Sequence, residues 1–210
     1  MRLEFDKASH KYSVCDTEIP SVTQILSWAR ETTDYSGIPE WVLKRAGQIG
    51  DTVHVTINRS LEHGGILFSY DHSANPYLDA YVDFDKEHTL EPWVCEQRMY
   101  CTCHGYAGTV DIVGKLDGVP TILDIKTTNV LNEDYVSKQT AGYQHLVKLF
   151  LDETFDETFF KRAALHLTKH SQQDLVWFED ESDWVVFEQM VHDYWNEHGG
   201  NPLVDETFSK

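Results

Sequence analysis

Apolar residues recur at every third or fourth position in the longest periodic stretch of the chain, residues 40–62. This spacing puts them on one face of a helix and predicts a stripe that is buried against the rest of the protein. Gly64 and Gly65 follow and predict where the helix ends. The stripe consists of Val42, Ala46, Ile49, Val53, Ile57 and Leu61.

Four further helices are predicted. A short helix begins after Ser21, which with Gln24 three residues later forms a capping box, and it extends to about Arg30. Two more cover residues 76–88 and 133–151. The last covers residues 181–197, and its apolar side consists of Trp184, Phe187, Met190, Val191 and Tyr194.

Alternating apolar and polar residues predict strands elsewhere. Residues 2–14 are expected to form a hairpin with its turn at Lys7–His10. An Asp117–Gly118 pair favours a tight turn between two later strands. The remaining predicted strands are 92–101, 105–115, 119–126, 160–168 and 173–178.

The order of these elements predicts an α/β (α+β) fold in which helices flank a central sheet. A length of 210 residues fits one domain with a full-sized core. We expect a single domain over 1–210. It comprises an N-terminal hairpin and helices (1–90), a catalytic sheet with a motif helix (91–178), and a C-terminal helix followed by a loosely held tail (179–210).

Composition and charge narrow the function classes. Hydrophobic residues make up 41% of the chain and aromatic residues 12%, as in an ordinary globular protein. The chain contains no run of 18 apolar residues and its N-terminus lacks an apolar signal segment, so we expect a cytoplasmic protein without a membrane contact. The net charge of −18 argues against a sequence-independent grip on nucleic acid through a basic surface, but leaves room for a local basic groove.

The four cysteines do not form a C-x-x-C pair. Cys101 and Cys103 flank one residue, with His104 adjacent. Zinc sites are typically formed by C-x-x-C pairs or by cysteines with nearby histidines. We therefore expect free thiols in a reducing compartment, and a metal cluster is the alternative.

Two neighbouring strands carry the polar residues that suggest chemistry. Alternation in Gly108–Gly114 puts Asp111 on one face with Thr109 and Val113, and Val110 with Ile112 on the other. On the next strand Asp124 and Lys126 share a face with Ile122. Because a short hairpin joins the strands, Asp111 is expected to lie near Asp124.

Two carboxylates within apolar strands are costly to bury without a compensating charge. Mg²⁺ or Mn²⁺ would compensate, since such ions take one or two carboxylates and complete their shell with water and substrate phosphate. Lys126 would then hold an attacking water or stabilise charge in the transition state. The alternative is a buried ion pair between Lys126 and Asp124 or Asp111, without a metal.

These residues resemble the PD-(D/E)xK nuclease superfamily in its RecB-like exonuclease branch, over roughly residues 10–145. The branch is similar to phage recombination exonucleases and mitochondrial genome-maintenance exonucleases. It carries a helical histidine, an aspartate, a D-x-K and a downstream Q-x-x-x-Y. Here these are His54, Asp111, Asp124-Ile125-Lys126 and Gln139…Tyr143, preceded by the Pro20–Thr23 segment.

The resemblance implies a restriction-endonuclease-like core and a metal-dependent DNA exonuclease in recombination, repair or phage DNA metabolism. It implies Mg²⁺ or Mn²⁺ held by His54, Asp111, Asp124 and the Ile125 carbonyl, with Lys126 positioning the nucleophilic water. Gln139 and Tyr143, neighbours on one helix face, would touch the site and the nucleic acid. Further candidates are Glu96 as support for the metal and Arg45, Thr127, Thr128 and Lys138 as DNA contacts.

The resemblance also sets limits. Some members of the branch hold an iron–sulfur cluster with cysteines after Q-x-x-x-Y, but none follows Cys103 here, so no such cluster is expected. A non-catalytic nucleic-acid or partner-binding module and an acidic DNA mimic are the alternative functions. DNA, and a recombination or replication protein, are the expected partners. A local basic path would draw on Lys44, Arg45, Lys115, Lys126, Lys138, Lys148, Lys161 and Arg162.

Overall fold

A five-stranded mixed sheet lies at the centre of the protein. The structure, a computed structural model, describes residues 2–7, 9–29, 37–64, 67–151 and 159–204. Only β6 and β7 run parallel, and the helix α4 (Glu133–Leu151) makes the crossover that a parallel pair requires. The expectation of a central mixed sheet is confirmed. Its strands, in spatial order, are β4 (Leu90–Cys101), β5 (Tyr106–Leu116), β6 (Val119–Lys126), β7 (Lys161–Leu167) and β8 (Gln173–Phe178).

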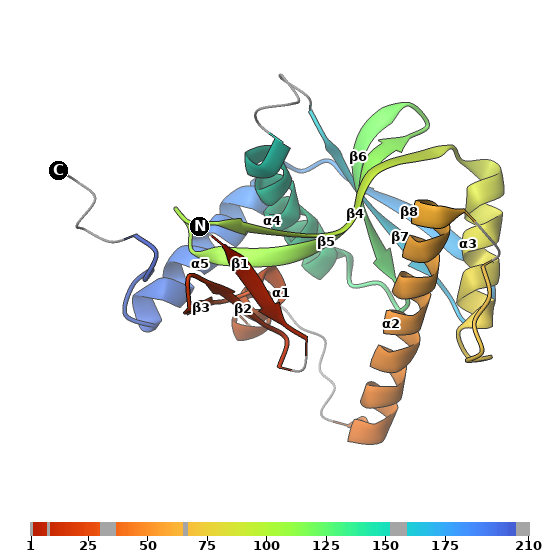
Figure 1. Cartoon of the computed structure of the whole chain (residues 1–210), viewed down its shortest axis with the longest axis horizontal. Coiled ribbons are helices and arrows are strands. Elements are labelled where there is room, and N and C mark those ends of the chain that lie inside the picture. Colours follow the sequence, from red (N-terminus) through yellow and green to blue (C-terminus); the bar gives the residue numbers. More distant parts are fainter. Residues whose placement is uncertain (1, 8, 30–36, 65–66, 152–158, 205–210) are drawn as a thin grey trace.

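Helices cover both faces of this sheet (Figure 1). On one face, α1 (Val22–Trp28), α4 and α5 (Ser182–Glu197) bury a cluster that includes Val113, Leu146 and Val191. On the other, α2 (Glu40–His63) and α3 (Asn75–Glu87) bury a second cluster that includes Phe84 and Leu123. Within the described ranges, no helix combines the length and apolar character needed to cross a membrane.

A small antiparallel sheet precedes the main one. The predicted hairpin is present as β1 (Leu3–Asp6) and β2 (Lys11–Val14), but it continues into a third strand, β3 (Thr17–Ile19), which the sequence analysis missed. The β2–β3 turn has φ values of 49° at Cys15 and 66° at Asp16. A tight turn of this kind is usually marked by Asn-Gly or Asp-Gly, so Cys-Asp gave no signal.

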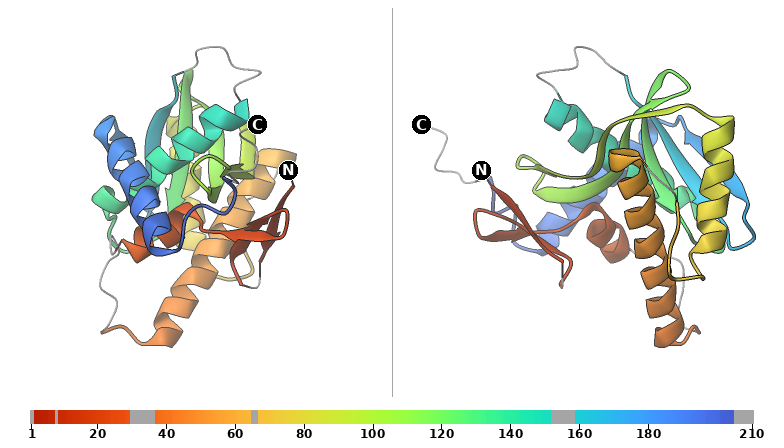
Figure 2. Two further views of the ribbon diagram at one scale, coloured as in Figure 1. Left: turned by 90° about the vertical axis from the view of Figure 1, so that its left-hand side faces the viewer. Right: turned by 45° about the vertical axis from the view of Figure 1, so that its right-hand side comes forward.

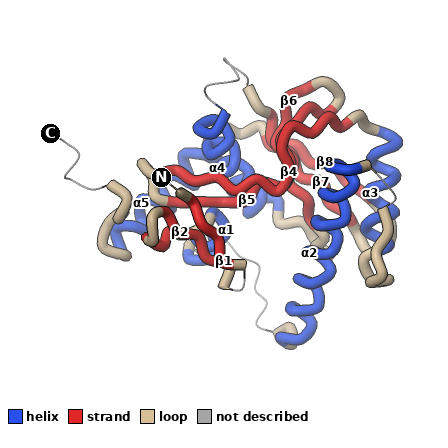
Figure 3. Tube along the Cα trace, viewed as in Figure 1, coloured by secondary structure: helices blue, strands red, loops and turns tan. Residues whose placement is uncertain are grey.

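The far end of the β4–β5 hairpin extends from the main sheet toward the small sheet and α5 (Figure 3). Ala107 of β5 is buried with Tyr12 and Val14, and its N–H donates to the Pro20 carbonyl at 2.9 Å. The chain beyond α5 packs here too: the Asn201 side chain donates to the Thr102 carbonyl at 2.9 Å. The expected loose tail is therefore wrong for residues 201–204, and 205–210 lie outside the described residues.

The helices agree with their sequence patterns, with one correction. Ser21 and Gln24 form the predicted capping box at the start of α1, whose expected end at Arg30 lies outside the described residues. In α2 the apolar stripe is buried only in its second half: Val53 and Ile57 are buried, whereas Ala46 is exposed. The reason is that the first half of α2 extends past the edge of the sheet (Figure 2). The other predicted bounds agree to within two residues.

Candidate functional site

The site forms where β5 and β6 separate. These strands pair from Leu116 opposite Val119 up to Ile112 opposite Leu123, and β6 then continues beside β7. Asp111 and Asp124 are the next residues on the two strands, so they flank the point of separation as the hairpin pattern predicts. The Ile125 N–H, which has lost a partner on β5, donates to Asp111 Oδ2 at 2.7 Å. The Asp111 carboxylate thus takes the place of a strand carbonyl.

The neighbouring strand is distorted at the same level. The β4–β5 ladder pairs Cys95 with Ile112 and Gln97 with Val110, and Glu96 between them has a φ of 48°. A left-handed backbone at a non-glycine residue inside a strand is strained, and such strain clusters at functional sites. The predicted shared face of Val110 and Ile112 is wrong: Val110 packs toward α4, whereas Ile112 packs toward α2 and α3.

His54 reaches this point from α2. Its Nδ1 lies 3.4 Å from Asp111 Oδ1 and 3.7 Å from Glu96 Oε1. One ligand atom from each of the three residues lies within 4.8 Å of the other two, as a shared metal ion would require. Glu96, expected only as support, therefore belongs to the ligand group itself.

Gly50 allows α2 to approach so closely. It lies one turn before His54, and a Cβ built there would be 3.1 Å from Thr127 Oγ1 at the end of β6. That distance is shorter than an ordinary contact between non-bonded atoms. A residue with a side chain at position 50 would therefore press against the end of β6, whereas Gly47 faces open space.

Asp124 and Lys126 form an ion pair next to this group. Lys126 Nζ lies 2.7 Å from Asp124 Oδ2, and the Asp124 carboxylate is almost fully buried. Apart from this lysine, Oδ2 has no hydrogen-bond partner among the described residues. The ion pair that the sequence analysis kept as an alternative is therefore present.

The charges of the group are strongly coupled. Burial disfavours a charged His54, but the carboxylates of Asp111 and Glu96 outweigh it and raise the pKa of His54 to about 10. Burial raises the pKa of Asp124 to about 6, against the attraction of Lys126. Burial would also raise the pKa of Asp111, but His54 and Lys126 hold it below its usual value. The carboxylates thus attract positive charge strongly.

The donor set fits a divalent cation. It combines an imidazole nitrogen with carboxylate oxygens, a mixture that suits Mn²⁺, and Mg²⁺ with fewer protein ligands. The side chains of His54 and Glu96 are 25% and 36% exposed, so water or a substrate oxygen has access from the solvent side. His54, Glu96 and Asp111 are the residues whose ligand atoms are close enough together to hold the ion. Asp124 does not belong to this group of three, and its Oδ2 is paired with Lys126.

Gln139 and Tyr143 of α4 lie side by side as their spacing predicts, with Gln139 Nε2 donating to the Tyr143 hydroxyl at 3.0 Å. Both are buried, and Tyr143 is close enough to Asp124 and Asp111 for their charges, after burial, to raise its pKa further. A Cβ on Gly108 of β5 would lie 2.8 Å from the Tyr143 ring. Gly108, which the sequence analysis did not single out, thus makes room for the tyrosine.

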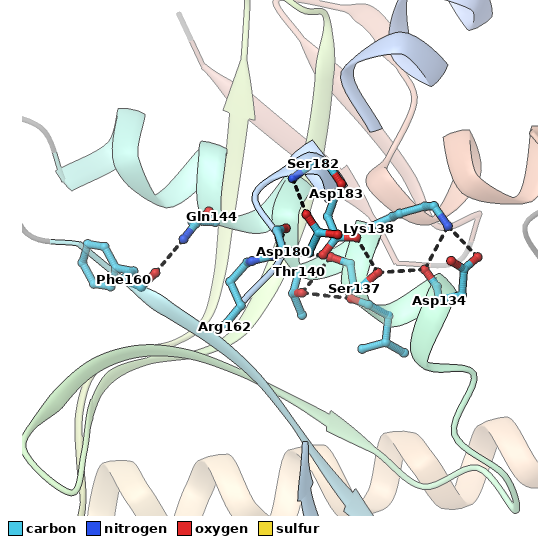
Figure 4. A network of polar contacts seen from close by, with 11 residues as sticks. Asp134, Ser137, Lys138, Thr140, Gln144, Phe160, Arg162, Asp180, Ser182 and Asp183 are labelled. Carbon is cyan, nitrogen blue, oxygen red and sulfur yellow. Dashed lines mark hydrogen bonds and ion pairs between the residues drawn. The ribbon is translucent and has the colours of Figure 1, made fainter. Parts of the chain in front are cut away.

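The two basic residues among the candidate DNA contacts already have protein partners. Arg45 pairs with Asp71 at 2.7 Å. Lys138 is buried and pairs with Asp134 one turn earlier on α4 (Figure 4). The Thr128 carbonyl is 2.7 Å from His166 Nε2. Thr127 and Thr128 directly follow Lys126 at the end of β6.

The expected basic path is largely neutralised. Five of its eight cations form ion pairs, among them Lys161 with Glu179 and the buried Arg162 with Asp183. The others are Arg45, Lys126 and Lys138. Among the described residues, most of the cations chosen from the sequence are therefore neutralised by a carboxylate neighbour.

Comparison with known proteins adds no identification. Neither a scan against protein-family models nor a search of curated proteins finds a match to this chain.

Proposed function

We propose that this chain is a metal-dependent deoxyribonuclease with a restriction-endonuclease-like core of the PD-(D/E)xK type, acting as an exonuclease on DNA ends or single strands. The observation that carries the proposal is the convergence of His54, Glu96 and Asp111 beside the Asp124–Lys126 pair. These groups come from the helix α2 and the strands β4, β5 and β6 and lie close together. A purely structural ion pair needs only two of them.

Each residue has a role that its position supports. The bound Mg²⁺ or Mn²⁺ would supply Lewis-acid activation of the phosphodiester and of a water molecule. Lys126, held by Asp124, would position the attacking water and offset negative charge as it develops. Asp111 is fixed by the Ile125 N–H and so keeps its second oxygen directed toward His54. The Gln139–Tyr143 pair would orient the DNA strand from α4.

One observation favours a different function. The net charge of −18 and the pairing of the basic residues suit an acidic DNA mimic that binds a DNA-binding protein. A mimic would not need a strained Glu96 beside a buried carboxylate group, so the nuclease is the better-supported proposal. The same assay separates the two, because a mimic does not cleave DNA.

The test is digestion of end-labelled single- and double-stranded DNA with Mg²⁺, with Mn²⁺ or with EDTA. We expect cleavage that EDTA abolishes, and a loss of about 10²–10³-fold in Lys126→Ala, the size typical of removing one group that stabilises transition-state charge. Lys86→Ala, at an exposed position on α3 outside the candidate basic path, is the matched control and should retain activity. Covalently closed single-stranded circles should resist cleavage if the enzyme needs an end. Absence of metal-dependent cleavage on every substrate would refute the proposal.

A further inference from the structure

A second group of metal-ligand residues lies about the turn between β4 and β5. Cys101 Sγ, Cys103 Sγ and His104 Nδ1 are mutually within 3.4 Å. His145, from the middle of α4, also belongs to the group, since its ligand atom lies within 4.8 Å of those of Cys101 and His104. From these positions we propose that Cys101, Cys103, His104 and His145 form a structural zinc site, a proposal independent of the proposed nuclease function.

The hydrogen bonds of the two histidines leave the appropriate nitrogens available. His104 Nε2 lies 3.0 Å from Glu188 Oε1 of α5, so the Nε2–H donates to a carboxylate and Nδ1 faces the thiols. A ligating histidine that donates its other N–H to a carboxylate is a common feature of zinc sites, because the carboxylate fixes the ring and raises its basicity. Glu188 therefore acts as a positioning residue for His104.

His145 is held in the same manner. The Tyr106 hydroxyl lies 3.1 Å from the Gly142 carbonyl and 2.8 Å from His145 Nδ1. In the tautomer with a hydrogen on Nδ1, His145 donates to this hydroxyl, the hydroxyl donates to Gly142, and Nε2 carries the lone pair that a metal needs. The Trp184 ring stacks on His145 with centroids 4.2 Å apart, which covers the site with apolar surface.

The spacing of the two sulfurs is that of neither a formed disulfide nor a formed zinc site. The two Sγ atoms lie 2.9 Å apart and both cysteines are free, whereas a disulfide bond measures about 2.0 Å. Two Zn–S bonds of about 2.3 Å at a tetrahedral angle separate the sulfurs by roughly 3.8 Å. The exposed Cys103 sits in a turn and needs to move by only about that difference, and each thiol releases its proton on binding.

The site would join parts of the chain that are distant in sequence. The turn after β4 lies at the end of the β4–β5 hairpin that extends toward α5, and His145 follows Tyr143 by two residues on α4. A zinc ion here would link this end of the hairpin to the helix that carries Gln139 and Tyr143. The sequence analysis kept a metal cluster at Cys101, Cys103 and His104 only as the alternative, because His145 and Glu188 come from helices 40 or more residues away.

The test is cobalt and zinc binding by the full-length chain. The purified reduced protein should bind one Zn²⁺ at this site, and Co²⁺ in its place should give thiolate-to-metal charge-transfer absorption with the visible bands of a tetrahedral ion. Chelation of the zinc should lower the melting temperature. Cys103→Ser should abolish the charge-transfer band or weaken metal binding at least 10-fold, and Glu188→Gln should weaken it about 10–100-fold.

Controls separate this site from the nuclease centre and from misfolding. Cys15→Ser and Cys95→Ser should keep the band, as should Asp124→Asn. Circular dichroism of Cys103→Ser should match the wild type. The proposal is overturned if the reduced protein binds no thiolate-ligated metal, or if it contains iron with acid-labile sulfide instead. A disulfide between Cys101 and Cys103 that persists under reducing conditions would also overturn it. His192 of α5 lies with His104 and Glu188 in a neighbouring group of possible ligands. Loss of zinc in His192→Ala but not in His145→Ala would therefore overturn the donor set.

Discussion

Arg162 anchors the start of the helix that carries Gln139 and Tyr143, and its removal tests whether that anchor matters. The side chain is only 4% exposed. Its guanidinium donates to the Ser137 carbonyl at 2.7 Å, the Asp180 carbonyl at 2.7 Å and Asp183 Oδ2 at 2.9 Å (Figure 4). One side chain of β7 thus joins the first turns of α4 and α5.

Arg162→Met keeps most of the volume and removes the charge. Breaking a buried pair by deleting one partner costs about 3–5 kcal/mol, because the other charge stays buried without compensation. Asp183 keeps a hydrogen bond from Ser137 Oγ at 2.9 Å, so we expect the lower end, about 3 kcal/mol. For a chain of this size that is a fall of roughly 6–12 °C in melting temperature.

Thermal and urea unfolding measure this difference. Lys161→Met is the matched control: its ion pair with Glu179 is 3.5 Å long and exposed, so its loss should cost less than about 1 kcal/mol. Adding Asp183→Asn to Arg162→Met should recover part of the lost stability, since the unpaired charge is removed. A loss below 1 kcal/mol in Arg162→Met, or an additive double variant, would contradict the account of this network.

Three other predictions follow from the same geometry. Tyr81→Phe should leave stability unchanged or raise it by about 1 kcal/mol in urea unfolding, because among the described residues the buried Tyr81 hydroxyl has no hydrogen-bond partner; a loss of 1 kcal/mol or more would contradict this. Gly108→Ala should destabilise by about 1–3 kcal/mol and slow cleavage, since its methyl group would displace Tyr143, whereas Gly47→Ala, in open space on a helix, should stabilise by about 0.5–1 kcal/mol. The slope of the logarithm of the DNA-binding constant against the logarithm of salt concentration should correspond to fewer than about four phosphate contacts, because most candidate cations are already paired. A steeper slope would contradict this by showing that more cations contact phosphate.

The periodic elements could be predicted from the sequence because their signals are local. The capping box at Ser21, the Asp117–Gly118 turn and the 133–151 helix each depend on residues within a few positions of one another. Asp111, Asp124 and Lys126 could be placed together for the same reason, since one short hairpin joins their strands.

What escaped prediction depends on long-range packing. Glu96 enters the ligand group only because its backbone is left-handed, which no local pattern signals. Gly108 matters because Tyr143 comes from a helix 35 residues later. The buried half of the α2 stripe was indistinguishable from the exposed half, because the edge of the sheet, not the helix, decides which residues are covered.

Manganese binding, read from the free-ion electron paramagnetic resonance signal and followed by cleavage of end-labelled DNA in the same samples, tests the central claim most directly. We predict that the wild type binds Mn²⁺ and cleaves, that Asp111→Asn and Asp124→Asn lose both, and that Cys103→Ser retains both. Wild-type protein that binds no Mn²⁺, or aspartate variants that bind and cleave as the wild type does, would contradict the assignment of this group as the metal centre of a nuclease.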